Sequence, residues 1–226
     1  MADDVLDALL SHLKAFGTPT VCAAVEALGG GLQEGGFTLS QPYCAFRHMD
    51  PVVGFARTAV LGRAPAGHDG NLAYYAYLAQ GRHPAVAVVQ DRGDAASGAF
   101  WGEAETAIHR GLGLLGCVTD GGVRDLGAID PRFQVLAGRV CPNPSPAAVV
   151  GFDGPVEVFG MKVAPGDLIH ADRHGAVVVP REHLAALPEA IDLCRRREEP
   201  LLRAARAGSL GLDDLRAALA EARAVR

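Results

Sequence analysis

The chain has 226 residues, a formal net charge of −5 and a hydrophobic content of 49%. This length can bury the core of one large domain, and the apolar content excludes an intrinsically disordered chain. The negative charge argues against a general nucleic-acid surface, and no apolar run reaches the roughly 18–20 residues that span a bilayer.

The cysteines and the N-terminus indicate a compartment. Five cysteines, an odd number, are widely scattered, which is typical of reduced thiols in the cytoplasm. The first residues, Met-Ala-Asp-Asp, are acidic and lack the basic region of a signal peptide. We therefore expect a cytoplasmic protein that binds neither nucleic acid nor a membrane.

Hydrophobic periodicity predicts alternating helices and strands. A helical region over residues 5–27 is broken at Gly17-Thr18-Pro19, where Thr18 is the predicted cap and Pro19 the first helical residue. The next strand–helix–strand units predict parallel strands joined by right-handed crossovers. The predicted strands are 52–64, 85–89, 117–119, 133–137, 156–159, 167–171 and 176–179, and the predicted helices are 69–80, 101–110, 181–207 and 212–224.

The segment Val118–Asp125 says most about function. It reads as a buried strand that stops at a glycine turn and then presents Arg124 beside Asp125. A carboxylate at this place can hold a hard cation, and a guanidinium can polarise an oxygen next to it. The alternative is a pair of exposed charges in which Asp125 caps a following short helix.

A second segment upstream can complete such a site. Gly102-Glu103-Ala104-Glu105 opens a predicted helix, and twenty residues separate Glu103 from Arg124. A strand end that faces a helix N-terminus suits the binding of a small anion on a metal.

Three other patterns carry weaker signals. Gly111–Gly116 matches G-x-G-x-x-G, but it follows a helix and precedes a strand, so a loop is favoured over a dinucleotide site. His170, Asp172 and His174 alternate and could reach a metal, although a hydrogen-bonded turn is the favoured interpretation. Asp91 ends a parallel strand, where both a ligand role and a turn role stay open.

The chain resembles the RraA-like family, which includes class II 4-hydroxy-4-methyl-2-oxoglutarate and 4-carboxy-4-hydroxy-2-oxoadipate aldolases. The similarity runs from about residue 16 to 207, nearly the whole chain. The segments that carry it are Gly102–Glu105, Thr119–Asp125, Thr18–Leu28, Gly54–Thr58, Pro165–Asp172 and Gly175–Pro180.

The resemblance implies a single-domain α/β fold, an α/β/β/α sandwich with N- and C-terminal helices. It also implies a homo-oligomer, a trimer or a hexamer, with sites near subunit boundaries. We expect residues 1–208 to form this domain and residues 209–226 a helical tail that contacts a neighbouring subunit.

The resemblance also implies roles for individual residues. The main-chain amides of Gly102, Glu103, Ala104 and Glu105 would bind the substrate carboxylate. Arg124 would bind the 2-keto oxygen, and Asp125 would hold Mg²⁺ or Mn²⁺. The general acid or base stays open among Asp91, Glu103, His170 and a metal-bound water. The implied reaction is retro-aldol cleavage to pyruvate, oxaloacetate decarboxylation, or both.

Two departures from the family pattern define the alternatives. Aldolase members commonly carry aspartate where this chain has Glu103, which keeps the charge but moves it by about a methylene. Members that inhibit the RNA-degrading endonuclease tend to carry an acid where this chain has Ala128. A protein-binding regulator with a vestigial site is therefore the second hypothesis, and another small-molecule activity on the same fold is the third.

Overall fold

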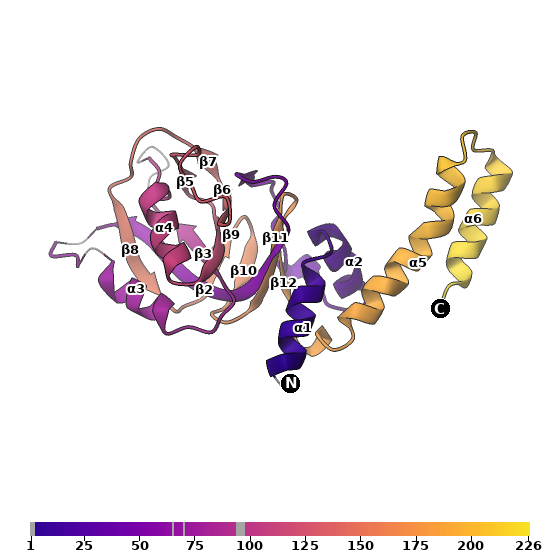
Figure 1. The fold of residues 1–226 in the computed structure, drawn as a ribbon, viewed down its shortest axis with the longest axis horizontal. Coiled ribbons are helices and arrows are strands. Elements are labelled where there is room, and N and C mark those ends of the chain that lie inside the picture. The colour runs from indigo at the N-terminus through magenta and orange to yellow at the C-terminus, as the bar shows by residue number, and fades with distance from the viewer. Residues whose placement is uncertain (1–2, 65, 70, 94–97) are drawn as a thin grey trace.

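The computed structural model describes residues 3–64, 66–69, 71–93 and 98–226. Within these ranges the chain forms a mixed α/β fold with a curled sheet and six α-helices (Figure 1). The helices are α1 (Asp3–Leu13), α2 (Thr18–Ala27), α3 (Leu72–Ala79), α4 (Glu103–Gly111), α5 (Leu187–Arg206) and α6 (Leu212–Ala224), with short 3₁₀ turns at Leu32–Glu34 and Arg181–His183.

The main sheet has the order β1-β6-β4-β3-β2-β11-β12, and β8 also pairs with β2. The strands β2, β3, β4 and β6 run parallel, as the strand–helix–strand order predicts, whereas β1, β8, β11 and β12 pair antiparallel. The strands are β1 (Tyr43–Cys44), β2 (Val52–Arg63), β3 (Ala85–Asp91), β4 (Leu114–Thr119), β5 (Gly122–Val123), β6 (Gln134–Ala137), β7 (Arg139–Val140), β8 (Ala147–Phe152), β9 (Val156–Val158), β10 (Met161–Val163), β11 (Leu168–Asp172) and β12 (Gly175–Val179).

Long β2 explains the curl of the sheet. Its first half pairs with β11 and its second half with β8, while β3 follows it on the other side. A register shift between Val60 and Leu61 marks a bulge in the β2–β8 pair. Bulges bend a strand and increase its twist, so the sheet wraps around its core instead of staying flat.

Two helical layers cover different parts of this sheet. Tyr74 and Leu78 on α3 pack with Trp101 and Phe133 in one apolar cluster. Leu13 on α1 belongs to a second cluster, in which α1, α2 and the start of α5 cover β11 and β12. Figure 1 shows α3 and α4 at one end of the body, and α1 and α2 at the other.

The N-terminus of α2 is capped differently from the sequence prediction. The helix begins at Thr18, the cap residue is Gly17, and Pro19 lies in the first turn. Thr18 N donates to the carboxylate of Asp172 over 3.0 Å. The prediction that Thr18 caps this helix is therefore wrong, because an acid 154 residues away supplies the acceptor.

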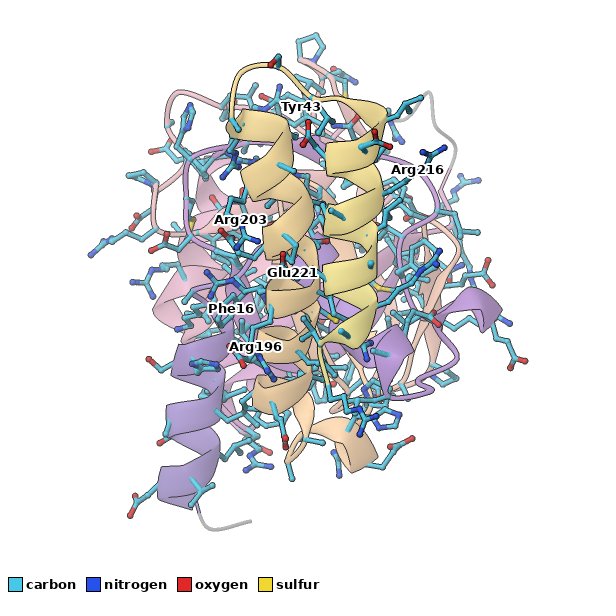
Figure 2. The ribbon with its side chains drawn as sticks, turned by 90° about the vertical axis from the view of Figure 1, so that its right-hand side faces the viewer. Phe16, Tyr43, Arg196, Arg203, Arg216 and Glu221 are labelled. Atoms are coloured by element: carbon cyan, nitrogen blue, oxygen red, sulfur yellow. The ribbon has the colours of Figure 1, made fainter. Side chains whose placement is uncertain are left out.

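The last two helices form an arm. Helices α5 and α6 lie side by side and project away from the body (Figures 1 and 2). Arg203 on α5 and Glu221 on α6 form an ion pair of 2.6 Å across this hairpin. On α6, Ala218 is buried against α5, whereas Leu212 is 74% exposed and Leu219 38% exposed.

None of the helices in the described ranges is long and apolar enough to cross a membrane.

Candidate active site

Main-chain hydrogen bonds join the segment before α4 to the segment after β4. Arg124 N donates to Trp101 O over 2.9 Å, and Trp101 N donates to Gly122 O over 3.3 Å. A Cβ added at Gly122 would lie 3.0 Å from Gly98 O, so only glycine lets the two segments come this close. This main-chain pairing places the start of α4 beside Arg124.

Gly102, Glu103, Arg124 and Asp125 meet at this junction. A Cβ added at Gly102 would lie 2.7 Å from Asp125 Oδ2 and 3.2 Å from the Arg124 side chain. Asp125 Oδ2 accepts a hydrogen bond from Arg124 Nη1 at 2.5 Å and a longer one from Glu103 N at 3.4 Å. Residues that are twenty or more positions apart in sequence therefore surround a single carboxylate oxygen.

Asp125 has an uncommon backbone conformation, with φ of +55°. Aspartate tolerates the left-handed region better than most residues, but a non-glycine residue there still costs about 1–3 kcal/mol. Residues 126–128 form a turn, so the alternative that Asp125 caps a following helix is wrong. The strain instead directs the carboxylate toward the start of α4, where its side chain is 34% exposed.

The junction offers several unused hydrogen-bond donors. The first amides of a helix lack intrahelical acceptors, and the helix dipole makes this end electropositive. At the start of α4 this applies to Ala104 and Glu105, while Glu103 N makes only the long contact to Asp125. In addition, Arg124 Nε is buried and has no partner among the described residues. A buried donor without an acceptor is costly, so an oxygen-rich ligand would stabilise this arrangement.

The two glutamates of α4 face different surroundings. The Glu105 carboxylate accepts a hydrogen bond from Tyr75 Oη at 3.0 Å, and its burial raises the pKa of this carboxyl. Behind it, His109 bonds the main-chain oxygen of Glu105 and the hydroxyl of Tyr74. The side chain of Glu105 thus anchors α4, whereas Glu103 is exposed at the junction.

His109 is neutral at physiological pH. Burial lowers the pKa of its imidazole to about 4, and the hydrogen bond to Glu105 O offsets part of this shift. The 3.8 Å approach between His109 and the Glu105 carboxylate is therefore not an ion pair near pH 7.

Two further acids end the neighbouring strands β3 and β4. Asp91 N donates to Asp120 Oδ1 over 2.7 Å, and Asp91 Oδ2 lies 3.6 Å from Arg139. Burial and the nearby charge of Asp91 raise the pKa of Asp120. Sequence reasoning singled out Asp91 but missed Asp120 and Arg139, although Asp120 also follows directly after an apolar strand.

The His170-x-Asp172-x-His174 pattern forms hydrogen bonds within the protein. His170 is fully buried, with Nδ1 at 3.0 Å from Thr18 Oγ1 and Nε2 at 3.1 Å from Leu13 O. Asp172 accepts from Thr18 N and from the main chain and ring of His174. No group of three or more His, Cys, Asp or Glu residues that could hold a metal occurs within the described ranges. His170 has no free ring nitrogen to offer a substrate.

Comparison with known proteins identifies the family of this chain. The family model for RraA-like proteins, described as Aldolase/RraA, matches residues 18–178. The chain belongs to the RraA-like family. This membership confirms the resemblance drawn from the motifs around Gly102 and Arg124, and it assigns the chain to a family that includes both aldolases and RraA inhibitors.

Individual relatives agree with this assignment. An uncharacterised protein of Methanocaldococcus jannaschii, MJ0644, is 36% identical over 43% of this chain, a match that spans half of that protein's length. A protein of Halalkalibacterium halodurans named "putative 4-hydroxy-4-methyl-2-oxoglutarate aldolase" is 27% identical over 72% of this chain and 73% of its own length.

A solved structure confirms the fold. RraAS2 of Streptomyces coelicolor, described as an unusual member of the RNase ES inhibitor RraA family, is 27% identical. It superimposes with a TM-score of 0.65 over 88% of this chain and 96% of its own. The α/β fold expected from the sequence is thus that of RraA-like proteins.

Proposed function

We propose that this RraA-like protein is a divalent-metal-dependent lyase of 2-oxo acids. Its reactions are retro-aldol cleavage of 4-hydroxy-4-methyl-2-oxoglutarate-type substrates, oxaloacetate decarboxylation, or both. Each reaction leaves a pyruvate enolate, so one site can serve both. The observation that carries the proposal is the meeting of Arg124, Asp125 and the start of α4 around one carboxylate oxygen.

The chain's own groups would bind and polarise the substrate. The amides of Gly102, Glu103, Ala104 and Glu105 at the start of α4 would donate hydrogen bonds to the substrate carboxylate. Arg124, with its unpaired Nε, would donate to the C2 oxygen, where negative charge builds as the C3–C4 bond breaks. A guanidinium held in place before the reaction stabilises this charge without reorganisation.

The proposed mechanism does not use a Schiff base. The chain contains only two lysines, Lys14 and Lys162. Lys14 follows α1 and Lys162 lies on β10, and both are remote in sequence from Arg124. The proposal therefore assigns stabilisation of the enolate to the charges of Arg124 and the metal.

The donor chemistry of the junction fits a hard divalent cation. Asp125 uses Oδ2 within the protein, while Oδ1 has no hydrogen-bond partner among the described residues. One protein carboxylate is enough for Mg²⁺ or Mn²⁺, because such ions keep several waters and take further oxygens from the substrate. Held by Asp125, the ion would act as a Lewis acid at the substrate's C2 oxygen.

Glu103 is our candidate for proton transfer. Glu103 follows Gly102 directly and its side chain is exposed, on the surface that a substrate would approach. Retro-aldol cleavage requires removal of the C4 hydroxyl proton, and a carboxylate is a suitable acceptor. Asp91 stays the second candidate, although its contacts to Gly93 and Arg139 already engage both of its oxygens.

Pyruvate release tests the proposal. The purified protein is given 4-hydroxy-4-methyl-2-oxoglutarate or oxaloacetate, with Mg²⁺ or with EDTA, and pyruvate is measured by a coupled dehydrogenase. We expect metal-dependent release from at least one substrate, above the rate of Mg²⁺ without protein. Release that is equal with and without protein for both substrates would contradict the proposal.

The second candidate function is inhibition of an RNA-degrading endonuclease. The similarity to RraAS2 supports it, since that protein is described within an inhibitor family. Ala128 weakens it, because inhibitors of this family tend to carry an acid there. An endonuclease assay with added protein distinguishes the two, since a pure lyase leaves RNA cleavage unchanged.

We also propose that the arm contacts a neighbouring subunit of a trimer or hexamer. The exposed leucines of α6 and the open, solvent-facing junction at Arg124 support this, because a second subunit could cover both. Light scattering on the full chain and on a chain truncated after Gly208 tests it. A full-length monomer at micromolar concentration would disprove the assembly, and an unchanged oligomer after truncation would disprove the role of the arm.

A further inference from the structure

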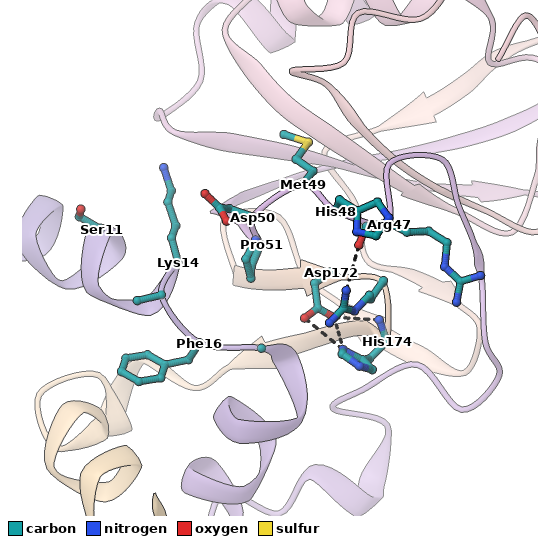
Figure 3. A pocket seen from close by; sticks show the side chains of 13 residues that line it. Ser11, Lys14, Phe16, Arg47, His48, Met49, Asp50, Pro51, Asp172 and His174 are labelled. Carbon is teal, nitrogen blue, oxygen red and sulfur yellow. Dashed lines mark hydrogen bonds and ion pairs between the residues drawn. The ribbon is translucent and has the colours of Figure 1, made fainter. Parts of the chain in front are cut away.

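The N-termini of three helices differ in what occupies their first amides. At α2, Thr18 N donates to Asp172, a carboxylate that also bonds His174 beside the α1–α2 connection (Figure 3). At α6, Gly211 N donates to Asp214 Oδ2 over 3.0 Å. In both helices a carboxylate of the protein itself takes the position that the helix dipole offers to an anion.

Helix α4 begins with the same acid pattern as α6 but lacks the same contact. The segments Gly102–Glu105 and Gly211–Asp214 each place an acid three residues after the cap glycine. An acid at this third helical position commonly reaches back to the amide of the cap residue. Asp214 does so, whereas Gly102 N has no acceptor among the described residues. The amide of Gly102 therefore stays open.

The Glu105 side chain is held by a neighbouring helix, which explains the difference. Tyr75 Oη on α3 lies 3.0 Å from each oxygen of the Glu105 carboxylate. Burial and the charge of Glu105 raise the pKa of Tyr75 to about 12, so its hydroxyl remains a hydrogen-bond donor at physiological pH. The acid that could close the start of α4 is thus engaged by α3.

The open amide adjoins the guanidinium of Arg124. A Cβ added at Gly102 would lie 3.2 Å from Arg124 Cζ, and Arg124 Nε is buried without a partner in the described part of the chain. An anion at the start of α4 can therefore take hydrogen bonds from main-chain amides and from this guanidinium together. Glu105 keeps its charge, which weakens anion binding, but its carboxylate does not occupy the amides.

We propose that Tyr75 is a positioning residue of this site, which keeps the start of α4 open for the carboxylate of a 2-oxo acid by holding the Glu105 side chain away. Without the Tyr75 hydroxyl, Glu105 would turn to Gly102 N as Asp214 turns to Gly211 N, and it would compete with the substrate. The inference rests on the proposed function, because it takes these amides as the carboxylate subsite.

Oxalate binding in a double-variant cycle tests the proposal. Oxalate is an unreactive probe that presents a carboxylate beside a further oxyanion, as the pyruvate enolate does. Tyr75→Phe should weaken oxalate binding about fivefold, the effect of one capping hydrogen bond, measured by calorimetry with Mg²⁺ present. The same change in a Glu105→Ala chain should have no effect, because the competing carboxylate is gone. An equal loss in both backgrounds would show that Tyr75 acts through packing and would overturn the proposal.

Matched variants control for the hydroxyl and for the place of binding. Tyr77→Phe removes a hydroxyl from the same helix that has no partner in the described ranges, so oxalate affinity should stay unchanged. Arg124→Ala should abolish oxalate binding, and binding that persists would place the probe elsewhere and overturn the proposal. Thermal melting confirms that each variant is folded, and Glu105→Gln, which removes the charge but keeps the shape, replaces Glu105→Ala if that variant unfolds.

The outcomes separate this proposal from the proposed function. If the unmodified protein binds no oxalate, the carboxylate subsite is absent and both proposals fail. If it binds oxalate and Tyr75→Phe binds it equally well, only the role of Tyr75 fails.

Kinetics give a second readout. Tyr75→Phe should raise KM for the better substrate about fivefold and leave kcat unchanged, because substrate and transition state lose the same carboxylate contact. A fall in kcat at constant KM would overturn the positioning role.

Discussion

Asp125 and Asp172 both lie at strand ends beside a helix N-terminus, yet they differ in what surrounds the carboxylate. Asp172 is 7% exposed and accepts three hydrogen bonds from Thr18 and His174. Asp125 is 34% exposed, binds the neighbouring Arg124 and, among the described residues, receives one long contact from the main chain of α4. Protein donors thus occupy both oxygens of Asp172, whereas Oδ1 of Asp125 has no hydrogen-bond partner in the described part of the chain.

This difference separates two roles that sequence alone does not. A carboxylate saturated by protein donors stabilises the fold, because any loss leaves buried donors unpaired. A half-satisfied carboxylate on a strained backbone is the kind of residue expected at a binding site. The comparison therefore supports a stabilising role for Asp172 and the proposed ligand-binding role for Asp125, and separate variants test the two roles.

The largest expected effect is on Asp125. Asp125→Asn should reduce metal-dependent pyruvate release by more than about 10³-fold, because the metal contributes several kcal/mol of transition-state stabilisation. Thermal melting should be nearly unchanged, since the side chain is partly exposed at the surface. An unfolded variant would make Asp125 structural, and full activity would place the metal elsewhere.

Asp172→Ala tests the stabilising role of the other carboxylate. It should lower the free energy of unfolding by about 3 kcal/mol, because it removes the cap of α2 and the hydrogen bonds of the β11–β12 turn. Urea denaturation measures this change. Asp213→Ala, at a side chain that is 95% exposed on α6, is the matched control and should leave the urea midpoint unchanged. Equal stabilities of the two variants would refute the assignment.

Arg124→Lys tests the other half of the junction. Lysine keeps the charge but loses the planar fork that can contact two oxygens, so we expect kcat to fall about 10²-fold. Steady-state kinetics with the better substrate separates the two parameters. A change confined to KM would show that Arg124 only anchors the substrate.

The smallest expected effect concerns His109, the buried histidine of α4. The folded-state pKa of His109 is lowered from 6.5 to about 4, so the unfolded chain binds the proton more tightly. Stability should therefore fall as pH decreases below 6.5, with His109 contributing about 2 kcal/mol between pH 7 and pH 5.

Urea titrations at the two pH values, on the protein and on His109→Gln, measure this contribution. Buried His170 shifts in the same direction, so the variant should keep part of the pH dependence. An identical pH dependence in both proteins would show that His109 is not the titrating group.

The sequence predicted best those helices and strands whose pattern of apolar residues lies within their own segment. The boundaries of α6 and of β2 agree with the predictions to within a residue. Strands β8 and β10 were missed, because β8 follows a proline-rich segment without polar alternation and β10 has only three residues. The predicted helix 181–207 is divided into a 3₁₀ turn and α5, which begins at Leu187 next to Pro188.

The site was predictable to the extent that its residues lie in two short motifs. The motifs around Gly102 and Arg124 predicted that a helix start would lie near a strand end, and the structure shows these residues in contact. The capping of Thr18 by Asp172 was not predictable, because it depends on sheet order across 154 residues. Metal binding and substrate choice stay predictions for the experiments above.

The pairing of Trp101 with Gly122 and Arg124 has a consequence for protein engineering. Because main-chain atoms hold the junction together, its geometry is insensitive to most side-chain changes nearby, with the glycines at 102 and 122 as exceptions. Position 104 is exposed, so under the proposed function it is the place to vary substrate preference, whereas Glu103 is the proposed proton acceptor and has to be kept. Gly102→Ala, in contrast, would push the side chains of Asp125 and Arg124 away from the start of α4 by adding a single methyl group and removing no functional group.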